Sequence, residues 1–290
     1  MLYSSNSIHL EMANESHLWQ ITEFLKHRSL SHQHLDWSNV EDWLRQDHFY
    51  ICQDHDKICG LVVIPFNADG NTWVKLLAID KSYPLANTGR EMFSICLKKL
   101  SEEKSPLAVH SLALWDWYEQ ILIRSNFTYQ DSIITMERNI SANNLQVETI
   151  PINAHQILPV TALDVYKVVE IDKQSFSPPW QLSCAELSNA ISNSDYVTGV
   201  RVNDNLVAYQ ISSVRLTNVH LNRIAVLPEY RNQKIGSSLI NDIFAHYHNS
   251  IVSTISVNTQ ASNEISRKLY RGYQFHETED SIPVYIYQSE

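Results

Sequence analysis

The sequence predicts two related α/β units, residues 1–146 and residues 147–290. Three observations predict this class. With 290 residues and 44% hydrophobic content, the chain can bury more than one core. Strand-like and helix-like segments alternate, and their order in the first half is repeated in the second. A polar segment, residues 141–156, is suited to connect the two halves.

The second half shows the pattern most clearly. Runs typical of strands occupy residues 206–214, 220–227, 253–259 and 282–288. Apolar residues recur at helical spacing over residues 237–248, and a second helix pattern over residues 263–275 ends at Gly272. A strand–helix alternation of this kind predicts a sheet with helices on its faces.

The first half repeats these landmarks 147 positions earlier. Ala78 aligns with Ala225, Tyr83 with Tyr230, Gly89 with Gly236 and, after one inserted residue, Phe127 with Phe275. A strand (residues 73–80), a helix (residues 91–100) and a closing strand (residues 132–138) follow in the same order. We therefore interpret the halves as two copies of one unit.

The composition narrows the range of functions. The net charge of -10 argues against general binding to nucleic acids or anionic membranes, because both need a basic face. No apolar run approaches the ~18 residues of a membrane span, and no signal peptide is recognisable. The spacing of the 4 cysteines indicates neither zinc ligation nor disulfides, and the 13 histidines are scattered. We expect a cytoplasmic protein with no metal, nucleic acid or membrane partner.

A basic turn, Arg231–Ser237, joins a strand to a helix. Such a turn leaves several backbone N–H groups pointing at one spot, and the positive end of the helix dipole attracts an anion there. Gly236 would let a phosphate approach the backbone, and Lys234 adds charge. The turn lacks the glycine patterns of a nucleotide P-loop or a dinucleotide fold. It indicates a ligand that carries phosphate, although the turn alone is equally compatible with a solvated loop.

Two blocks resemble motifs of the GNAT (GCN5-related N-acetyltransferase) superfamily. Residues 223–240, RIAVLPEYRNQKIGSSLI, resemble its acyl-CoA-binding motif, with Lys234 in place of the first glycine of R/Q-x-x-G-x-G/A. Residues 258–275, NTQASNEISRKLYRGYQF, resemble its N-x-x-A-x-x-L-Y-x-x-x-G-F block. The resemblance implies two tandem domains, each a mixed, largely antiparallel twisted sheet flanked by helices.

The resemblance also implies an acetyl-CoA-dependent N-acetyltransferase in which an amine attacks the thioester directly. The strand residues Ile224, Ala225 and Val226 would bind the pantetheine arm through free backbone groups. The other coenzyme-binding residues that it implies are Arg231, Asn232, Gln233, Lys234, Ile235, Gly236, Ser237 and Asn263. Tyr270 would donate a proton to the leaving thiolate, which suits a phenol with a pKa near ~10.

The general base is not apparent from the sequence. The strands around the predicted site, VHLNRIAV and STISVNTQ, contain no carboxylate. His220 is the nearest titratable side chain, and its ordinary pKa suits proton abstraction. A water relay through the backbone and Asn222 is the alternative.

The acceptor side is predicted at residues 171–187, IDKQSFSPPWQLSCAEL, where two prolines interrupt a helix pattern before Trp180. In the superfamily the loop between the first two helices forms the acceptor wall, so Trp180 and Asn222 are the predicted substrate-binding residues. The PW pair resembles enzymes that acetylate peptide N-termini, whereas the NTQASN block also resembles amino-sugar acetyltransferases. We expect a small-molecule amine, with a protein N-terminus or lysine as the alternative. A non-catalytic acyl-CoA sensor is the alternative of another class.

The first half lacks the residues that carry this chemistry. At equivalent positions Arg231 becomes Pro84, Lys234 becomes Asn87, Ser237 becomes Arg90, Asn263 becomes Trp115 and Tyr270 becomes Leu122. Proline has no N–H to donate, and leucine has no proton to give. We expect residues 1–146 to form a degenerate, non-catalytic domain that contacts the catalytic domain, residues 147–290.

Overall fold

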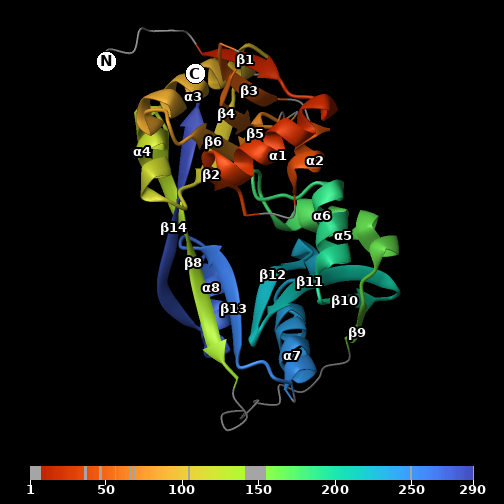
Figure 1. The fold of residues 1–290 in the computed structure, drawn as a ribbon. Coiled ribbons are helices and arrows are strands. Elements are labelled where there is room, and N and C mark those ends of the chain that lie inside the picture. The colour runs from red at the N-terminus through yellow and green to blue at the C-terminus, as the bar shows by residue number, and fades with distance from the viewer. Residues whose placement is uncertain are drawn as a thin grey trace. The chain divides into compact units, whose positions relative to one another are not determined.

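The computed structural model describes residues 8–289 except residues 36, 37, 46, 47, 56, 66, 68, 104, 141–154 and 249. The chain forms two compact units (Figure 1). Unit 1 comprises Met1–Asp131 and Ile282–Glu290, and unit 2 comprises Ser132–Ser281. The predicted boundary between residues 146 and 147 lies outside the described residues.

The elements of unit 1 are β1 (His9–Met12), η1 (Glu15–His17), α1 (Leu18–His27), β2 (Ser29–Gln33), α2 (Val40–Leu44), β3 (Phe49–Asp54), β4 (Lys57–Val63), β5 (Asn71–Trp73), β6 (Leu76–Asp80), α3 (Leu85–Glu103), β7 (Ala108–Leu112) and α4 (Asp116–Arg124). Strands β8 (Thr128–Asn139) and β14 (His276–Gln288) contribute residues to both units.

The elements of unit 2 are β9 (Gln156–Pro159), η2 (Ala162–Asp164), α5 (Val165–Ser175), α6 (Cys184–Asn193), β10 (Tyr196–Val202), β11 (Asn205–Arg215), β12 (Asn218–Val226), η3 (Pro228–Tyr230), α7 (Ile235–Tyr247), β13 (Thr254–Gln260) and α8 (Glu264–Gly272). Helix α8 ends at Gly272 as predicted, but the left-handed residue beyond it is Gln274, with φ 58°.

The two units repeat the same order of elements, as the sequence predicts, except that β2, β5 and η3 have no separate counterpart among the described residues of the other unit. Strand β9 begins and ends 147 positions after β1, and α5 begins 147 positions after α1. Both helices follow a short 3-10 turn closed by a capping box, at Asn14 in unit 1 and at Thr161 in unit 2. The two copies therefore share the same capping interaction before their first helix.

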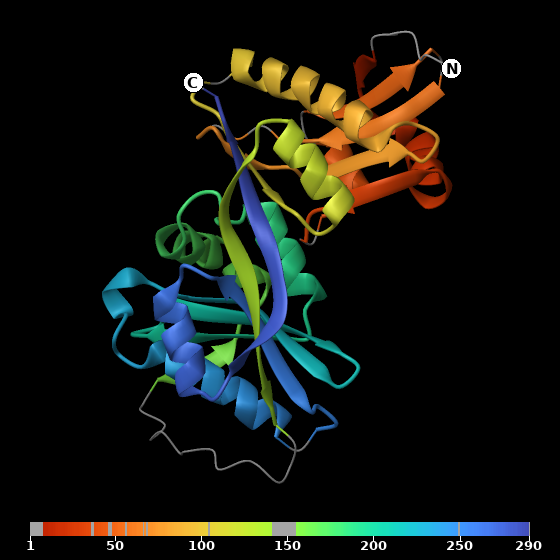
Figure 2. The ribbon, with the colours of Figure 1, turned by 90° about the vertical axis from the view of Figure 1, so that its left-hand side faces the viewer.

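In unit 2 the strands lie in the order β8-β13-β12-β11-β10-β9. All neighbours are antiparallel except β12 and β13, which are parallel. Helices α7 and α8 lie on one side of these strands and α5 and α6 on the other (Figure 2). On the α7 side, Leu221 and Val257 of the sheet pack with Ile240 and Phe244 of α7. The predicted class, a mixed and largely antiparallel sheet flanked by helices, is confirmed.

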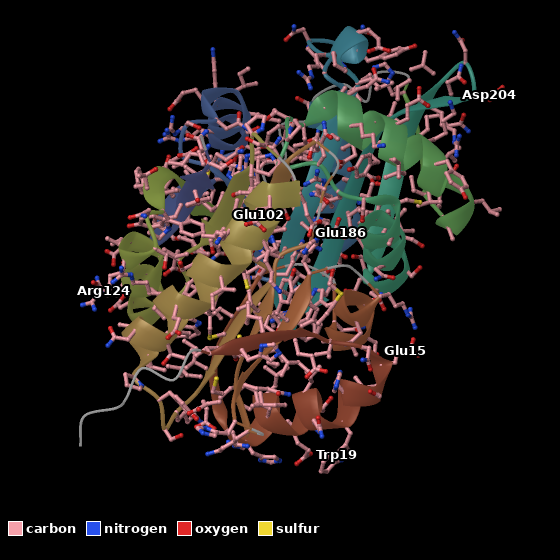
Figure 3. All side chains as sticks on the ribbon, turned by 90° about the horizontal axis from the view of Figure 1, so that it is seen from above. Glu15, Trp19, Glu102, Arg124, Glu186 and Asp204 are labelled. Carbon is pink, nitrogen blue, oxygen red and sulfur yellow. The ribbon has the colours of Figure 1, made fainter. Side chains whose placement is uncertain are left out.

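Unit 1 has the antiparallel strand order β1-β3-β4-β6-β2. A second group of strands joins β7 to β5 in parallel and to the last residues of β14 in antiparallel orientation. Trp43 and Phe24 fill the core under α1 and α2, whereas Phe93 and Tyr118 fill the core under α3 and α4. Trp19 of α1, by contrast, points outward and is exposed (Figure 3).

Within the described ranges, no helix has the length and apolar character needed to cross a membrane.

Candidate coenzyme and acyl-transfer site

Strand β12 has an open edge. Its parallel pairing with β13 covers Asn218 to Leu221 and then stops, while its pairing with β11 continues to Val226. The register with β11 shifts at Asn222, which has no partner across the ladder, as in a β-bulge. Among the described residues, residues 222–226 therefore have no strand partner on the β13 side. We call these residues the open edge of β12.

The backbone of Val226 faces this open side. Its carbonyl accepts hydrogen bonds from Arg231 Nε (3.2 Å) and from Ser175 Oγ (3.2 Å), and neither donor belongs to β11. Because backbone direction alternates along a strand, Ile224 faces the same side and Ala225 faces β11. Of the three predicted strand residues, Ile224 and Val226 therefore present backbone groups at the open edge.

The turn after β12 presents a run of unused backbone donors. Among the residues that the structure describes, no backbone N–H from residue 232 to residue 237 has an acceptor. Ser238 N–H is the first that bonds within the helix, to the Lys234 carbonyl (2.9 Å). Asn232 and Lys234 are both left-handed, with φ 61° each. Such a conformation costs non-glycine residues about 1–3 kcal/mol each, so the rest of the fold must hold the turn in place.

Gly236 is a glycine that internal packing does not require. A Cβ built on it would meet only Leu269 and Val226, both at 3.8 Å, which is ordinary contact. The position is not left-handed either, so the backbone also does not require glycine there. The missing side chain therefore leaves an opening beside the unused donors.

The predicted charged residues of the turn have different roles. Arg231 folds back, because its Nη2 donates to the Ser175 carbonyl (3.3 Å) as its Nε donates to Val226. Gln233 donates to the Glu229 carbonyl (3.2 Å). Lys234 is exposed at the helix start. Arg231 and Gln233 therefore stabilise the turn, and Lys234 is the cation of this segment best placed to meet a ligand.

Tyr270 of α8 is buried in the unit 2 core. Burial raises the pKa of its phenol above the ordinary value. Its hydroxyl has no hydrogen-bond partner among the described residues. The phenol is therefore protonated at neutral pH and has a proton available.

Asn263 has a structural role that the sequence did not predict. It is the N-cap of α8, and its Oδ1 accepts the Ser266 N–H (3.1 Å). Its side-chain amide N–H groups are left for another partner.

His220 and Asn222 each have a polar side-chain partner. His220 Nδ1 is 2.9 Å from Ser256 Oγ, and Asn222 Nδ2 donates to Ser213 Oγ (2.7 Å). Burial, followed by the charge of Arg215, lowers the pKa of His220 below its ordinary value. Since Val219 and Leu221 pack toward Tyr270, alternation directs His220 to the other face of the sheet.

Trp180 lies in the segment between α5 and α6, and its carbonyl accepts a hydrogen bond from Arg223 Nη2 (2.6 Å). Sequence reasoning missed Arg223 and its partner Asp172, whose Oδ2 is 2.6 Å from Arg223 Nε. The sequence did carry a signal for Arg223, since it is a charged residue within a strand pattern that is otherwise largely apolar. Charged side chains are rarely buried without a partner, so such a residue indicates a paired charge.

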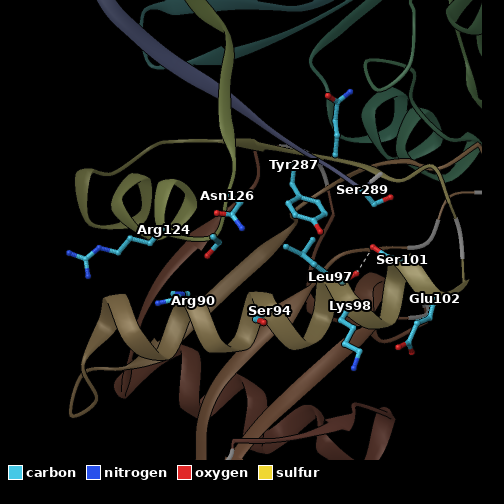
Figure 4. A pocket seen from close by; sticks show the side chains of 12 residues that line it. Arg90, Ser94, Leu97, Lys98, Ser101, Glu102, Arg124, Asn126, Tyr287 and Ser289 are labelled. Carbon is cyan, nitrogen blue, oxygen red and sulfur yellow. Dashed lines mark hydrogen bonds between the residues drawn. The ribbon is translucent and has the colours of Figure 1, made fainter.

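A separate cavity of about 700 Å³ lies in unit 1 (Figure 4). It is lined by one face of α3, the end of α4 and the last residues of β14. It contains none of the predicted site residues. Its cations, Arg90, Lys98 and Arg124, are exposed, so water and salt screen their charge.

Comparisons with known proteins relate part of the chain to acetyltransferases. The Acetyltransferase (GNAT) family matches residues 165–275. The chain is 24% identical over 193 residues to the tRNA(Met) cytidine acetyltransferase TmcA of Haemophilus ducreyi, an alignment that covers 60% of this chain and 31% of that protein. The chain thus spans about a third of the length of this curated relative.

Solved structures with a similar fold cover nearly the whole chain. A GCN5-related N-acetyltransferase from Anabaena variabilis has a TM-score of 0.70 at 10% identity, covering 96% of this chain and 72% of that one. A putative acetyltransferase from Pyrococcus horikoshii has a TM-score of 0.61 at 12% identity, covering 100% and 92%. A tandem GNAT protein from the clavulanic acid biosynthesis pathway has a TM-score of 0.56 at 9% identity, covering 83% and 82%. At these identities the likeness concerns the fold alone.

Proposed function

We propose that unit 2 transfers the acetyl group of acetyl-CoA to a primary amine of a small molecule, because residues 165–275 match the Acetyltransferase (GNAT) family. One observation carries the proposal: the open edge of β12 runs directly into a turn whose backbone donors, from residue 232 to residue 237, are unused. An extended amide chain that ends in a pyrophosphate has the matching shape and charge.

The residues present fit this coenzyme. The backbone groups of Ile224 and the N–H of Val226 would pair with the amides of the pantetheine arm, as an added strand does, while the Val226 carbonyl stays bonded to Ser175 and Arg231. Residues 232–237 would bind the pyrophosphate, with Lys234 as the cation and the missing side chain of Gly236 as the space for an oxygen. Acetyl-CoA supplies the activated acetyl group as a thioester.

The chain's own groups would manage the two protons of the reaction. Tyr270 would give its phenolic proton to the sulfur as the C–S bond breaks, because its raised pKa keeps it protonated. His220 would accept a proton from the acceptor ammonium or amine, because its lowered pKa keeps the imidazole neutral at pH 7. A water held by Asn222 and Ser213 is the alternative route for this second proton.

The proposed acceptor binds on the α5–α6 side, near Trp180 and Asn222. A protein N-terminus or a lysine is the alternative acceptor within this reaction class. A second candidate is a nucleic acid base, because the curated relative is named a tRNA(Met) cytidine acetyltransferase. The net charge of -10 weighs against it, since binding to RNA depends on cationic contacts with phosphates.

Unit 1 is proposed to be a non-catalytic copy. In the predicted division of the chain this copy is residues 1–146, and the catalytic domain is residues 147–290. Leu122, at the position of Tyr270, is fully buried and has no proton to donate.

The test is release of free CoA thiol from acetyl-CoA by the purified chain. Separate reactions would contain polyamines and amino sugars, peptides with a free N-terminus or lysine, and unmodified tRNA(Met). Turnover with small amines alone would support the proposal, and turnover with tRNA alone would replace it with the second candidate. Coenzyme binding without turnover on any acceptor would favour a sensor.

A further inference from the structure

We propose that Arg223 is a positioning residue for acetyl transfer: together with Asp172 it holds residues 176–182 away from the open edge of β12. This inference rests on the proposed function, because it assigns to these residues the task of keeping the coenzyme's place free. The observations that carry it are the contacts of the two side chains and the state of the same segment in unit 1.

Asp172 is the fixed point of this arrangement. It lies on α5 and is fully buried. Its Oδ2 accepts hydrogen bonds from Arg223 Nε and from the Tyr209 hydroxyl, both at 2.6 Å. Its Oδ1 accepts the Leu182 N–H (2.9 Å), at the far end of the segment. One carboxylate thus joins the helix, two strands and the segment.

Arg223 holds the middle and the beginning of the segment. Its Nη2 donates to the Trp180 carbonyl (2.6 Å), and its guanidinium carbon lies 3.8 Å from the centroid of the Phe176 ring. Trp180 N–H bonds back to the Ser177 carbonyl (2.9 Å) in a turn. Residues 176–182 therefore form a closed arch, and the planar guanidinium fits its inner side.

The same segment in unit 1 has the opposite conformation. Strand β2, Ser29–Gln33, lies 147 positions before residues 176–180 and likewise follows the first helix of its unit. It pairs antiparallel along β6, from Ser29 with Asp80 to Gln33 with Leu76. The edge of β6 that corresponds to the open edge of β12 is therefore covered by the chain itself.

The residues that hold the arch are missing where the edge is covered. At the same offset Asp172 becomes Leu25, Tyr209 becomes Val62 and Arg223 becomes Leu76. All three replacements are aliphatic. A buried ion pair generally stabilises a fold no better than well-packed apolar residues do, so stability alone does not explain its presence in unit 2.

Two prolines also distinguish residues 176–180 from β2, but they do not hold the segment in place as the Asp172–Arg223 ion pair does. Pro178 and Pro179 correspond to Ser31 and His32 of β2. Proline has no N–H for a ladder, so residues 176–180 are poor strand partners. Poor pairing alone does not fix the position of the segment. The contacts of Asp172 and Arg223 do so, together with the hydrogen bonds of Gln181 Nε2 to the Lys173 and Phe176 carbonyls (3.0 and 2.8 Å).

The test compares the wild type with a double variant, Arg223→Leu with Asp172→Leu. It restores two of the three unit 1 residues and leaves no unpaired buried charge. Trp180 is the only tryptophan in unit 2, so its ¹⁹F resonance in 5-fluorotryptophan-labelled protein can be assigned by Trp180→Phe. The resonance should shift, and KM and Kd for acetyl-CoA should rise about tenfold or more as the competent state becomes less populated. At saturation, kcat should change much less.

Two further variants sharpen this test. Arg223→Lys keeps the positive charge but loses the planar, forked guanidinium. Its KM for acetyl-CoA and its Trp180 resonance should therefore lie between those of the wild type and the double variant. Arg201→Leu with Asp164→Leu removes another ion pair of unit 2 (2.5 Å) and should change neither KM nor the Trp180 resonance.

An unchanged Trp180 resonance with an unchanged KM in the folded double variant would overturn the inference. A fall in kcat alone would overturn it as well. If the wild type binds no acetyl-CoA, the proposed function fails, while the resonance still reports whether Arg223 holds the arch.

Discussion

The strand–turn–helix segment occurs twice in this chain, and the two copies start their helices at different points. In unit 2, α7 begins at Ile235, after a turn with left-handed residues at Asn232 and Lys234. In unit 1, α3 already begins at Leu85, the position that corresponds to Asn232. Pro84 stands just before it and favours an immediate helix start. The residues that offer free donors in unit 2 are thus part of a helix in unit 1.

In unit 1 the backbone donors of the corresponding turn are bonded to groups of the chain itself, including a carboxylate. The carboxylate of Asp80 accepts the Ser82 N–H (2.9 Å) and the Ser82 hydroxyl (2.6 Å), and it is paired with Arg28. Lys81 N–H is used as well, by the Arg28 carbonyl (3.0 Å). The backbone donors of Lys81 and Ser82 therefore serve the fold.

The two aligned glycines, Gly89 and Gly236, also differ in what lies around them. A Cβ on Gly89 would lie 2.7 Å from Ile121 Cδ1, so this glycine allows α3 and α4 to pack closely. A Cβ on Gly236 would meet nothing closer than 3.8 Å. One glycine is needed for internal packing, and the other leaves room for a ligand.

The largest expected effect concerns the proposed acid. Tyr270→Phe should lower kcat about 100-fold, as expected for loss of a general acid, because the ring and its packing stay while the proton is removed. Kd for acetyl-CoA, measured by calorimetry, should stay within a factor of about 3, since no hydrogen bond of the hydroxyl is lost. Tyr118→Phe removes a buried hydroxyl in unit 1 and is the matched control. A large loss of binding in Tyr270→Phe would assign the residue to the coenzyme site rather than to proton transfer.

The glycine pair gives the second prediction. Gly236→Ala should weaken acetyl-CoA binding about tenfold while the folded state is unchanged or up to about 1 kcal/mol more stable, because alanine favours a helix. Gly89→Ala should leave binding unchanged and destabilise the fold by about 1–3 kcal/mol through overpacking against Ile121. Calorimetry and chemical denaturation measure the two effects. The same response in both variants would remove the difference between the two turns.

Lys234→Glu should weaken acetyl-CoA binding by about tenfold at low salt, because it places a negative charge beside the bound phosphates. The loss should shrink as ionic strength rises from about 0.05 M to 0.5 M, since salt screens exposed charges. Lys98→Glu changes an exposed cation of the unit 1 cavity and should have no effect. Equal effects of the two substitutions would mean that binding responds to net charge rather than to the turn.

The smallest effect comes from the strand that covers β6. Burial lowers the pKa of His32 to about 3, and its ring stacks on Tyr118 at 3.8 Å. The unfolded chain therefore binds a proton near pH 6.5 that the folded chain does not bind, so stability falls as the pH drops below about 6.5. The loss should be about 1 kcal/mol between pH 6.5 and 5.5 for this residue. His32→Phe keeps the stacked ring and should reduce the slope of stability against pH; an unchanged slope would contradict neutral burial of His32.

The sequence was most informative where periodicity and turn chemistry act locally. It predicted a helix over residues 237–248, and α7 spans Ile235–Tyr247. The matching landmarks identified the repeat, because the two copies share the order of their elements. Gly89 shows the limit: its alignment with Gly236 is evident from the sequence, but its function depends on Ile121, which only the packing of α4 brings close.

Long-range contacts could not be predicted. Asp172 and Arg223 are 51 positions apart, and nothing in either local pattern pairs them. Strand β2 (SLSHQ) lacks the apolar alternation of a strand, since it is ordered by pairing with β6. Asn263 matched a coenzyme-binding motif, yet the bond that the structure records is a helix cap, because an N-cap is defined by the turn around it.

The most direct test of the account is calorimetric titration of acetyl-CoA into the purified full-length chain, with the number of sites as the result. We predict one site per chain, which Gly236→Ala weakens and Gly89→Ala leaves unchanged. Two sites per chain, or one site that persists in Gly236→Ala at full affinity, would contradict the claim that the open edge of β12 and its turn form the binding site while β2 closes the matching edge in unit 1.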